Sequence, residues 1–113
     1  MGRVSLIRGH SLKWERHPTF PSAHRAYLST REMTDAFVNL LLKIEPGGEI
    51  PPHIHEDRID ALYILEGEGE ALVNGQRQRC GPGDYIFAPP LTEHGIRNSG
   101  EEPLILHATF CPP

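Results

Sequence analysis

The chain has 113 residues, and 11 lysines and arginines against 15 aspartates and glutamates give it a formal net charge of -4. This length suits one domain with a single hydrophobic core, residues 1–113. The sequence has no basic run and no basic stripe with interleaved aromatic residues, which argues against a nucleic-acid partner. Its apolar runs fall far short of the roughly 20 residues of a membrane helix, and the first residues lack a secretory apolar core, so we expect a cytoplasmic protein without membrane contact.

Eleven glycines and 11 prolines lie between short apolar runs. This composition is typical of an all-β domain with many turns and argues against a helical bundle. The two cysteines, Cys80 and Cys111, belong to no Cys-x-x-Cys motif. A chain without a secretory signal usually keeps its thiols reduced. We therefore predict two free cysteines.

Residues 1–31 combine prolines with isolated aromatic residues and histidines. This mixture predicts an extended N-terminal arm that packs against other parts of the molecule. We expect no metal role for the histidines of this arm, which are His10, His17 and His24.

Residues 37–44 are apolar almost without a break, which predicts a strand that is covered on both faces. A strand alternates its side chains between two faces, so half of these residues point inward. The outward half then needs a cover, which the N-terminal arm or a second subunit could supply. The expected inner residues are Val38, Leu40, Leu42 and Ile44, and the expected outer apolar residues are Phe37 and Leu41.

Further short strands follow, separated by turn signals. Asn74-Gly75 is the strongest hairpin signal of the sequence. Short strands with regularly spaced turns predict a sandwich or barrel, here over residues 37–110. The expected strands are 61–65, 70–73, 76–80, 85–88, 95–98 and 104–110.

Several apolar side chains on these strands would line a cavity for a small organic ligand if they faced inward. Taken singly, the aromatic ones are more typical of a core or an interface. His107 lies in the last strand, where the period of two leaves both faces open, and we favour the outward one. The apolar residues concerned are Leu62, Tyr63, Ile64, Tyr85, Phe87 and Ile96.

Four residues have the types and the spacing of a mononuclear metal site. His53 and His55 share one face of a strand, because side chains at i and i+2 point the same way. Asp60 follows after a turn-prone segment, 56–58, and His94 lies about forty residues after the first two histidines. Three imidazoles and one carboxylate suit a divalent transition metal ion such as Fe, Mn, Zn, Ni or Co, without selecting one. Four protein ligands also leave open positions on a metal that prefers six, which catalysis needs.

The sequence resembles the cupin superfamily through residues 47–98, in two motifs whose spacing holds without a gap. The first is a Gly, five residues, His-x-His, three or four residues, Glu, six residues and Gly, matched by Gly47, His53, His55, Asp60 and Gly67. The second is a Gly, five residues, Pro-x-Gly, two residues, His, three residues and Asn, matched by Gly83, Pro89, His94 and Asn98. The resemblance implies a small antiparallel β-barrel of jelly-roll form, and a homodimer that exchanges N-terminal strands.

The chain departs from these motifs at two positions. Asp60 stands where the family usually has Glu, and Leu91 stands where the second motif has Gly. Because Asp is one methylene shorter, Asp60 either binds the metal directly or leaves three direct histidine ligands. In the second case it reaches the metal through a water or orients a histidine by a hydrogen bond. Asn98, before Ser-Gly, is interpreted as turn chemistry. Arg58 is interpreted as part of a solvated turn, although near the site it could receive an anionic substrate.

Two functions from different classes agree with these residues. The first is a metal-dependent enzyme that acts on a small organic molecule. Oxygenase-like chemistry is favoured over isomerase or decarboxylase chemistry, because a mixed histidine and carboxylate site accommodates redox-active iron or manganese. The alternative is a non-catalytic module that binds or senses a small ligand with the same metal site. The fold alone does not decide between them.

Overall fold

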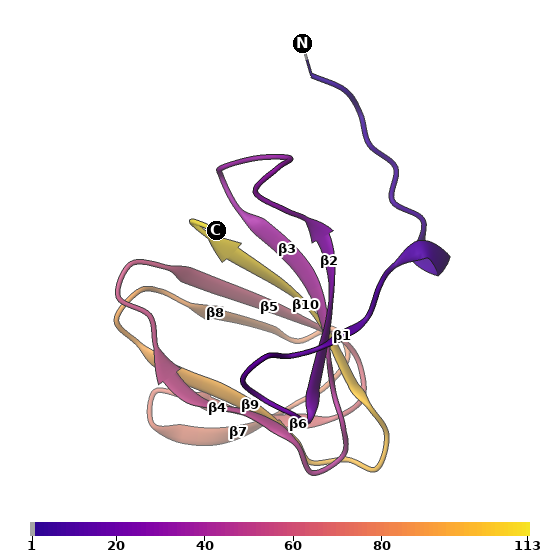
Figure 1. The fold of residues 1–113 in the computed structure, drawn as a ribbon. Coiled ribbons are helices and arrows are strands. Elements are labelled where there is room, and N and C mark those ends of the chain that lie inside the picture. Colours follow the sequence, from indigo (N-terminus) through magenta and orange to yellow (C-terminus); the bar gives the residue numbers. More distant parts are fainter. Residues whose placement is uncertain (1) are drawn as a thin grey trace.

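The computed structural model describes residues 2–113, which form ten strands and one short 3-10 helix (Figure 1). The 3-10 helix η1 spans Gly9–Ser11 and is the only helix of the described residues. None of the described residues forms a helix long and apolar enough to cross a membrane. The strands are β1 (Glu15–Arg16), β2 (Ala23–Ser29), β3 (Val38–Ile44), β4 (Glu49–Ile54), β5 (Ile59–Glu66), β6 (Gly69–Val73), β7 (Gln76–Cys80), β8 (Tyr85–Ala88), β9 (Glu93–Asn98) and β10 (Leu104–Cys111).

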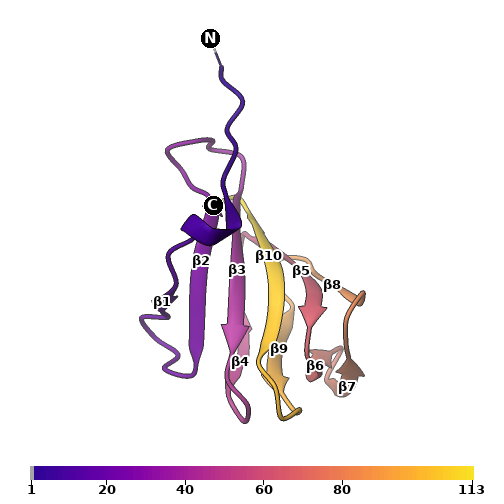
Figure 2. The same cartoon turned by 90° about the vertical axis from the view of Figure 1, so that its right-hand side faces the viewer.

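The strands form two antiparallel sheets. The larger has the order β1-β2-β3-β10-β5-β8 and the smaller the order β4-β9-β6-β7. The six-stranded sheet lies in front of the four-stranded one in Figure 2, so that their inner faces oppose each other. Residues distant in sequence, such as those of β3 and β10, lie side by side. This is the jelly-roll arrangement that the sequence predicted.

The central strand β3 alternates as predicted. Its buried residues face the core between the sheets, and β10 supplies buried partners in register with them, such as Leu106 opposite Leu42. The two-residue hairpin at Asn74-Gly75 is also confirmed, because Val73 pairs with Gln76. Both of its turn residues have positive φ, 50° and 79°, which Asn and Gly tolerate best.

The predicted N-terminal arm is wrong for residues 23–29. They form β2, which pairs with β3 along its length, for example Ala23 with Ile44. Ala23 and Ala26 are fully buried, whereas the inward positions opposite Leu40 and Leu42 carry Tyr27 and Arg25. Because these inward residues are polar, the sequence lacks the apolar alternation that would have indicated a strand. Only the chain before β1 extends from the barrel, as Figure 1 shows.

The outer face of the six-stranded sheet carries an apolar patch. Tyr85 and Phe87 on β8 are 60% and 56% exposed, and Tyr63 and Leu65 on β5 lie on the same face. We call these four residues the outer patch. None of the four residues lines the cavity between the two sheets. Of the two interpretations of the aromatic residues, a cavity lining is therefore excluded, and a core or an interface remains. His107 pairs with Tyr63 and alternates with buried neighbours, so it faces outward as favoured.

Candidate metal centre

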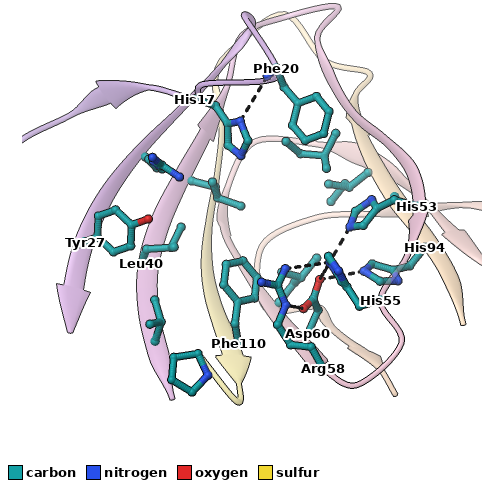
Figure 3. Close-up of a pocket in the computed structure, with 18 of the residues that line it drawn as sticks. His17, Phe20, Tyr27, Leu40, His53, His55, Arg58, Asp60, His94 and Phe110 are labelled. Carbon is teal, nitrogen blue, oxygen red and sulfur yellow. Dashed lines mark hydrogen bonds and ion pairs between the residues drawn. The ribbon is translucent and has the colours of Figure 1, made fainter. Parts of the chain in front are cut away.

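The structure brings together the four residues that the sequence selected. His53 lies near the end of β4 and pairs in register with His94 of β9, while Asp60 reaches them from β5 in the other sheet. His55 lies just beyond β4, and the predicted turn at 56–58 returns the chain to β5. One donor atom from each residue lies within 4.8 Å of all the others. Figure 3 shows the four side chains converging at one side of a cavity.

The carboxylate of Asp60 lies at the centre of the cluster. Its Oδ2 atom is 2.8 Å from Nε2 of His94, 3.2 Å from Nε2 of His55 and 3.9 Å from Nε2 of His53. Metal–nitrogen bonds of about 2.0–2.1 Å allow opposite donors to lie about 4 Å apart. The donor atoms therefore need only small rotations to surround one ion.

Backbone hydrogen bonds orient two of the imidazoles. Nδ1 of His53 donates to the carbonyl oxygen of Pro51 at 2.8 Å, and Nδ1 of His94 donates to that of Thr92 at 3.0 Å. With the proton on Nδ1, the Nε2 lone pair of a neutral imidazole points into the cluster. The short contact between Nε2 of His94 and Asp60 then requires a proton or a cation between two electron-rich atoms. This donor set fits a divalent ion.

Arg58 belongs to the site, which corrects its interpretation as a solvated turn residue. Its Nε donates to Oδ1 of Asp60 at 3.1 Å, and its Nη2 donates to Nε2 of His55 at 2.8 Å. The guanidinium also packs over the ring of Phe110, 4.2 Å from the centroid. An ion on His55 would use the same lone pair, so it must displace the hydrogen bond from Nη2. The contact to Oδ1 of Asp60 can persist.

The protonation of the cluster follows from these contacts. Burial alone would raise the pKa of Asp60, but its interactions with the nearby His53 and His94 imidazoles and the charge of Arg58 outweigh burial and hold that pKa well below its usual range. The hydrogen bond to Asp60 raises the pKa of His94. Burial lowers the pKa of His55. Asp60 is therefore an anion that can balance the charge of a metal ion.

Gly95 is a site residue that the sequence analysis missed. A Cβ atom at this position would lie 2.9 Å from the carbonyl oxygen of Ile50 and 2.9 Å from the backbone nitrogen of Pro52. Both contacts are with backbone atoms of β4, which cannot rotate away. The missing side chain thus lets β9 approach β4 closely enough to bring His94 beside His53. A Gly directly after a candidate ligand on a strand is the signal that could have indicated this role.

Leu91 adopts the conformation for which the motif has Gly. Its φ is +66°, and its side chain is 71% exposed. Its N–H donates to the carbonyl oxygen of His55 at 2.7 Å, which ties this turn to the metal cluster. The tight turn is therefore kept despite the substitution, at the cost of a left-handed leucine.

Asn98 has a structural role, as the sequence favoured. Its Nδ2 donates to the carbonyl oxygens of Ile44 and Glu102, and its Oδ1 accepts from the N–H of Gly100. The buried amide thus joins both sheets to the following turn. Cys80 and Cys111 are free thiols, as predicted.

The cluster opens onto a cavity of about 540 Å³ between the sheets. Leu62 and Ile96 line it, as anticipated for inward residues, and so do other apolar side chains such as Leu40 and Phe110. Arg25 and Tyr27 of β2 and His17 of the preceding loop line it as well. We call these three residues the β2 wall. The sequence did not predict this wall, because the composition of residues 1–31 indicates an arm. Recognition of a strand at 23–29 would have turned Arg25 and Tyr27 inward.

Comparisons with known proteins agree with this architecture. The family model of the cupin domain matches residues 40–110, more than half of the chain. A crystal structure of a predicted oxalate decarboxylase from Thermotoga maritima superposes with a TM-score of 0.87 at 26% identity, covering 96% of this chain and 100% of that one.

Two relatives are similar in sequence over the motif region. An uncharacterized protein of Methanocaldococcus jannaschii is 36% identical over 61 residues, which are 54% of this chain and 49% of that protein. Quercetin 2,3-dioxygenase of Bacillus subtilis is 28% identical over 74 residues, which are 66% of this chain and 22% of the enzyme. The matched segments thus span half or less of these relatives. With the family model, both motifs and the jelly-roll sheets in agreement, the chain belongs to the cupin family.

Proposed function

We propose that this protein is a metal-dependent enzyme that acts on a small organic molecule. The observation that carries the proposal is the position of the His53, His55, Asp60 and His94 cluster at the side of a largely apolar cavity. A volume of about 540 Å³ lies within the range of pockets that enclose small ligands. A purely structural ion would not need such a cavity beside it.

The residues of the cluster would hold one divalent ion, such as Fe, Mn, Zn, Ni or Co. When bound, the ion would supply Lewis acidity to a substrate oxygen and, if redox-active, electron transfer. His53, His55 and His94 bind it through nitrogen, and Asp60 lowers the net charge of the site. Arg58 keeps Asp60 oriented through its hydrogen bond to Oδ1.

The β2 wall supplies polar groups for the substrate. Nδ1 of His17 accepts the backbone N–H groups of Thr19 and Phe20, so the proton of a neutral His17 is on Nε2. Burial and the nearby charge of Arg25 lower the pKa of His17, which keeps the ring neutral near pH 7. His17 can therefore donate a hydrogen bond to a substrate oxygen, and the Tyr27 hydroxyl offers a second donor.

Oxygenase-like chemistry remains favoured over isomerisation or decarboxylation. The ligand set of three imidazoles and one carboxylate suits redox-active iron or manganese. The similarity to quercetin 2,3-dioxygenase supports this preference, whereas the likeness to a predicted oxalate decarboxylase keeps decarboxylation in view. The alternative is a module that binds a small ligand at the same metal without turnover.

Metal analysis followed by activity assays tests the proposal. Protein purified without added metal should carry one transition metal ion per chain, measured by elemental analysis. Oxygen uptake and product formation are then followed on a panel of catechols, diketones and hydroxy acids. Metal-dependent turnover that is absent in His94→Ala supports an enzyme. Stoichiometric metal without turnover on any panel member would favour the binding module.

We also propose that the protein is a cytoplasmic homodimer in which a second copy covers the outer patch. Tyr63, Leu65, Tyr85 and Phe87 are each more than 40% exposed on one sheet face, and such a patch is typical of an interface. The two free cysteines suit a reducing compartment. Sedimentation velocity of wild type and Phe87→Glu tests the dimer, since a charge in the patch should give monomers.

A further inference from the structure

The cavity beside the metal cluster is lined by an excess of positive charge. Arg25, Arg31 and Arg58 all line it, whereas Asp60 is the only carboxylate side chain among the described lining residues. Asp60 is already engaged by Arg58 and the histidines of the cluster, and Arg31 donates to the backbone oxygen of Pro113 at 2.6 Å. A bound metal ion would make the cavity more positive still.

Arg25 stands out among these arginines because its charge is not balanced. Its Nε–H is buried and has no hydrogen-bond partner in the described part of the chain, and none of the ion pairs found there includes Arg25. Its guanidinium lies 5.2 Å from the ring centroid of Tyr27, which holds the side chain without neutralising it. A partly desolvated cation with a buried N–H that has no acceptor lowers the stability of the fold, unless a bound ligand supplies the acceptor and the negative charge.

Arg25 lies on a different wall from most of the metal ligands. It belongs to β2 of the six-stranded sheet, whereas His53 and His94 belong to β4 and β9 of the other sheet. Figure 3 shows Tyr27, its neighbour on β2, across the cavity from these histidines. His17 lines the same cavity as Arg25, and the Arg25 charge adds to the effect of burial in lowering the pKa of His17. A ligand that reaches from the cluster to the β2 wall crosses an apolar interior.

We propose that the substrate is a small organic acid that binds at both ends, with oxygen atoms at the metal cluster and an oxyanion group on Arg25. The inference rests on the proposed function for its first end and on the β2 wall alone for its second. The fork of a guanidinium matches two oxygens of a carboxylate or a phosphate. Tyr27 and the Nε2–H of His17 add neutral donors beside it. Arg25 is thus a specificity residue rather than part of the metal centre.

Titration of the metal-loaded protein with matched acids tests this assignment. The ligands are malonate, succinate and glutarate, each compared with the monoacid of equal carbon count, namely propionate, butyrate and valerate. Phosphonoacetate serves as a further arm that distinguishes a phosphate-like end from a carboxylate. By calorimetry we expect at least one diacid to bind about tenfold or more tightly than its monoacid, because only the diacid reaches Arg25.

Variants of Arg25 identify the second end. Arg25→Met should abolish the preference for diacids while leaving monoacid binding and metal content unchanged. The melting temperature of Arg25→Met without ligand should stay level or rise, because a partly buried charge without a counter-ion is removed, whereas loss of a merely structural arginine would lower it. Arg25→Lys keeps the charge without the fork and should retain part of the preference. Arg16→Met is the matched control, since Arg16 is exposed on β1 outside the cavity.

The outcomes separate this inference from the proposed function. Unchanged diacid affinity in both Arg25→Met and Arg25→Lys, with metal bound, overturns the role of Arg25 but leaves the metal enzyme intact. If instead the wild-type protein retains no metal, the proposed function fails. Glutarate or phosphonoacetate binding to that metal-free protein, lost in Arg25→Met, would still support the anion site.

Discussion

The metal cluster and the β2 wall line the same cavity but differ in how their polar groups are satisfied. In the cluster, carbonyl oxygens accept the Nδ1 protons of His53 and His94, and Arg58 and the histidines surround Asp60. On the β2 wall, the buried Nε–H of Arg25 has no partner within the described chain. Ligands whose other polar atoms are already hydrogen-bonded preorganise a cation site, whereas a hydrogen-bond donor without a partner leaves a place for an anion.

The largest effect on the metal cluster should come from removal of one of its histidine ligands. We expect His94→Ala to lower metal affinity by at least about 100-fold, because a histidine held between Asp60 and Thr92 is lost. Elemental analysis after dialysis against a chelator measures retention. His107→Ala on the outer face is the control and should keep its metal. Full occupancy in His94→Ala would refute the assignment of the site.

Neutralising Asp60 tests whether the carboxylate organises the cluster. Asp60→Asn should weaken metal binding by about 10- to 100-fold. It should also lower the pKa of His94 in the metal-free protein, because the hydrogen bond to Asp60 is the main reason that this pKa is raised. Competition titration and NMR titration of the imidazole measure the two effects. Asp57→Asn, in the exposed turn, should change neither, and an unshifted His94 pKa in Asp60→Asn would contradict the proposed coupling.

Gly95→Ala tests the close approach of β9 to β4. The new Cβ would press on backbone atoms of Ile50 and Pro52 at 2.9 Å, so we expect a loss of about 1–3 kcal/mol in the free energy of unfolding. Urea denaturation measures it. Gly81→Ala is the control, because the nearest atom to its Cβ lies 3.9 Å away. Equal losses of stability in both variants would show that the contact of Gly95 with β4 is not what makes the substitution unfavourable.

Leu91→Gly should stabilise the protein. A left-handed leucine costs about 1–2 kcal/mol, while glycine loses about 0.4–1 kcal/mol through the entropy of the unfolded chain. The balance is a gain in the free energy of unfolding of about 0 to 1.6 kcal/mol, measured in the same denaturation experiment. Gly83→Ala, whose φ is +91° in open space, should change stability in the opposite direction. A loss on Leu91→Gly would mean that its exposed side chain contributes more than the strain.

The smallest effect concerns the pH dependence contributed by His17. Burial and Arg25 lower its pKa in the folded state, so near and below pH 6.5 the unfolded chain binds more protons at this residue than the folded one. His17 therefore contributes stability that is complete above the unfolded pKa and is lost as the pH falls through the folded pKa. As the pH is lowered from 8 to 5, the urea midpoint of unfolding should fall less steeply in His17→Asn than in wild type. His10→Asn, in the exposed 3-10 helix, should follow wild type.

The sequence predicted most of the barrel because its signals are local. In β3 the alternation of Val38 to Ile44 survives in the structure, and Asn74-Gly75 formed the expected hairpin. The strand at 23–29 was missed for a physical reason. Its inward positions carry Arg25 and Tyr27, which serve the cavity rather than the core, so the apolar alternation that reveals a strand is absent.

The candidate ligands were found from spacing, whereas their surroundings were not. His53, His55, Asp60 and His94 fall at positions that strand geometry and two motifs relate to each other, so the sequence alone selected them. The contacts of Arg58 with Asp60 and His55, the fit of Gly95 against β4, and the facing of Arg25 across the cavity arise from segments that pair only in the folded chain. Periodicity fixes which face of a strand a side chain occupies, but only the packing of one sheet on the other decides what that side chain meets.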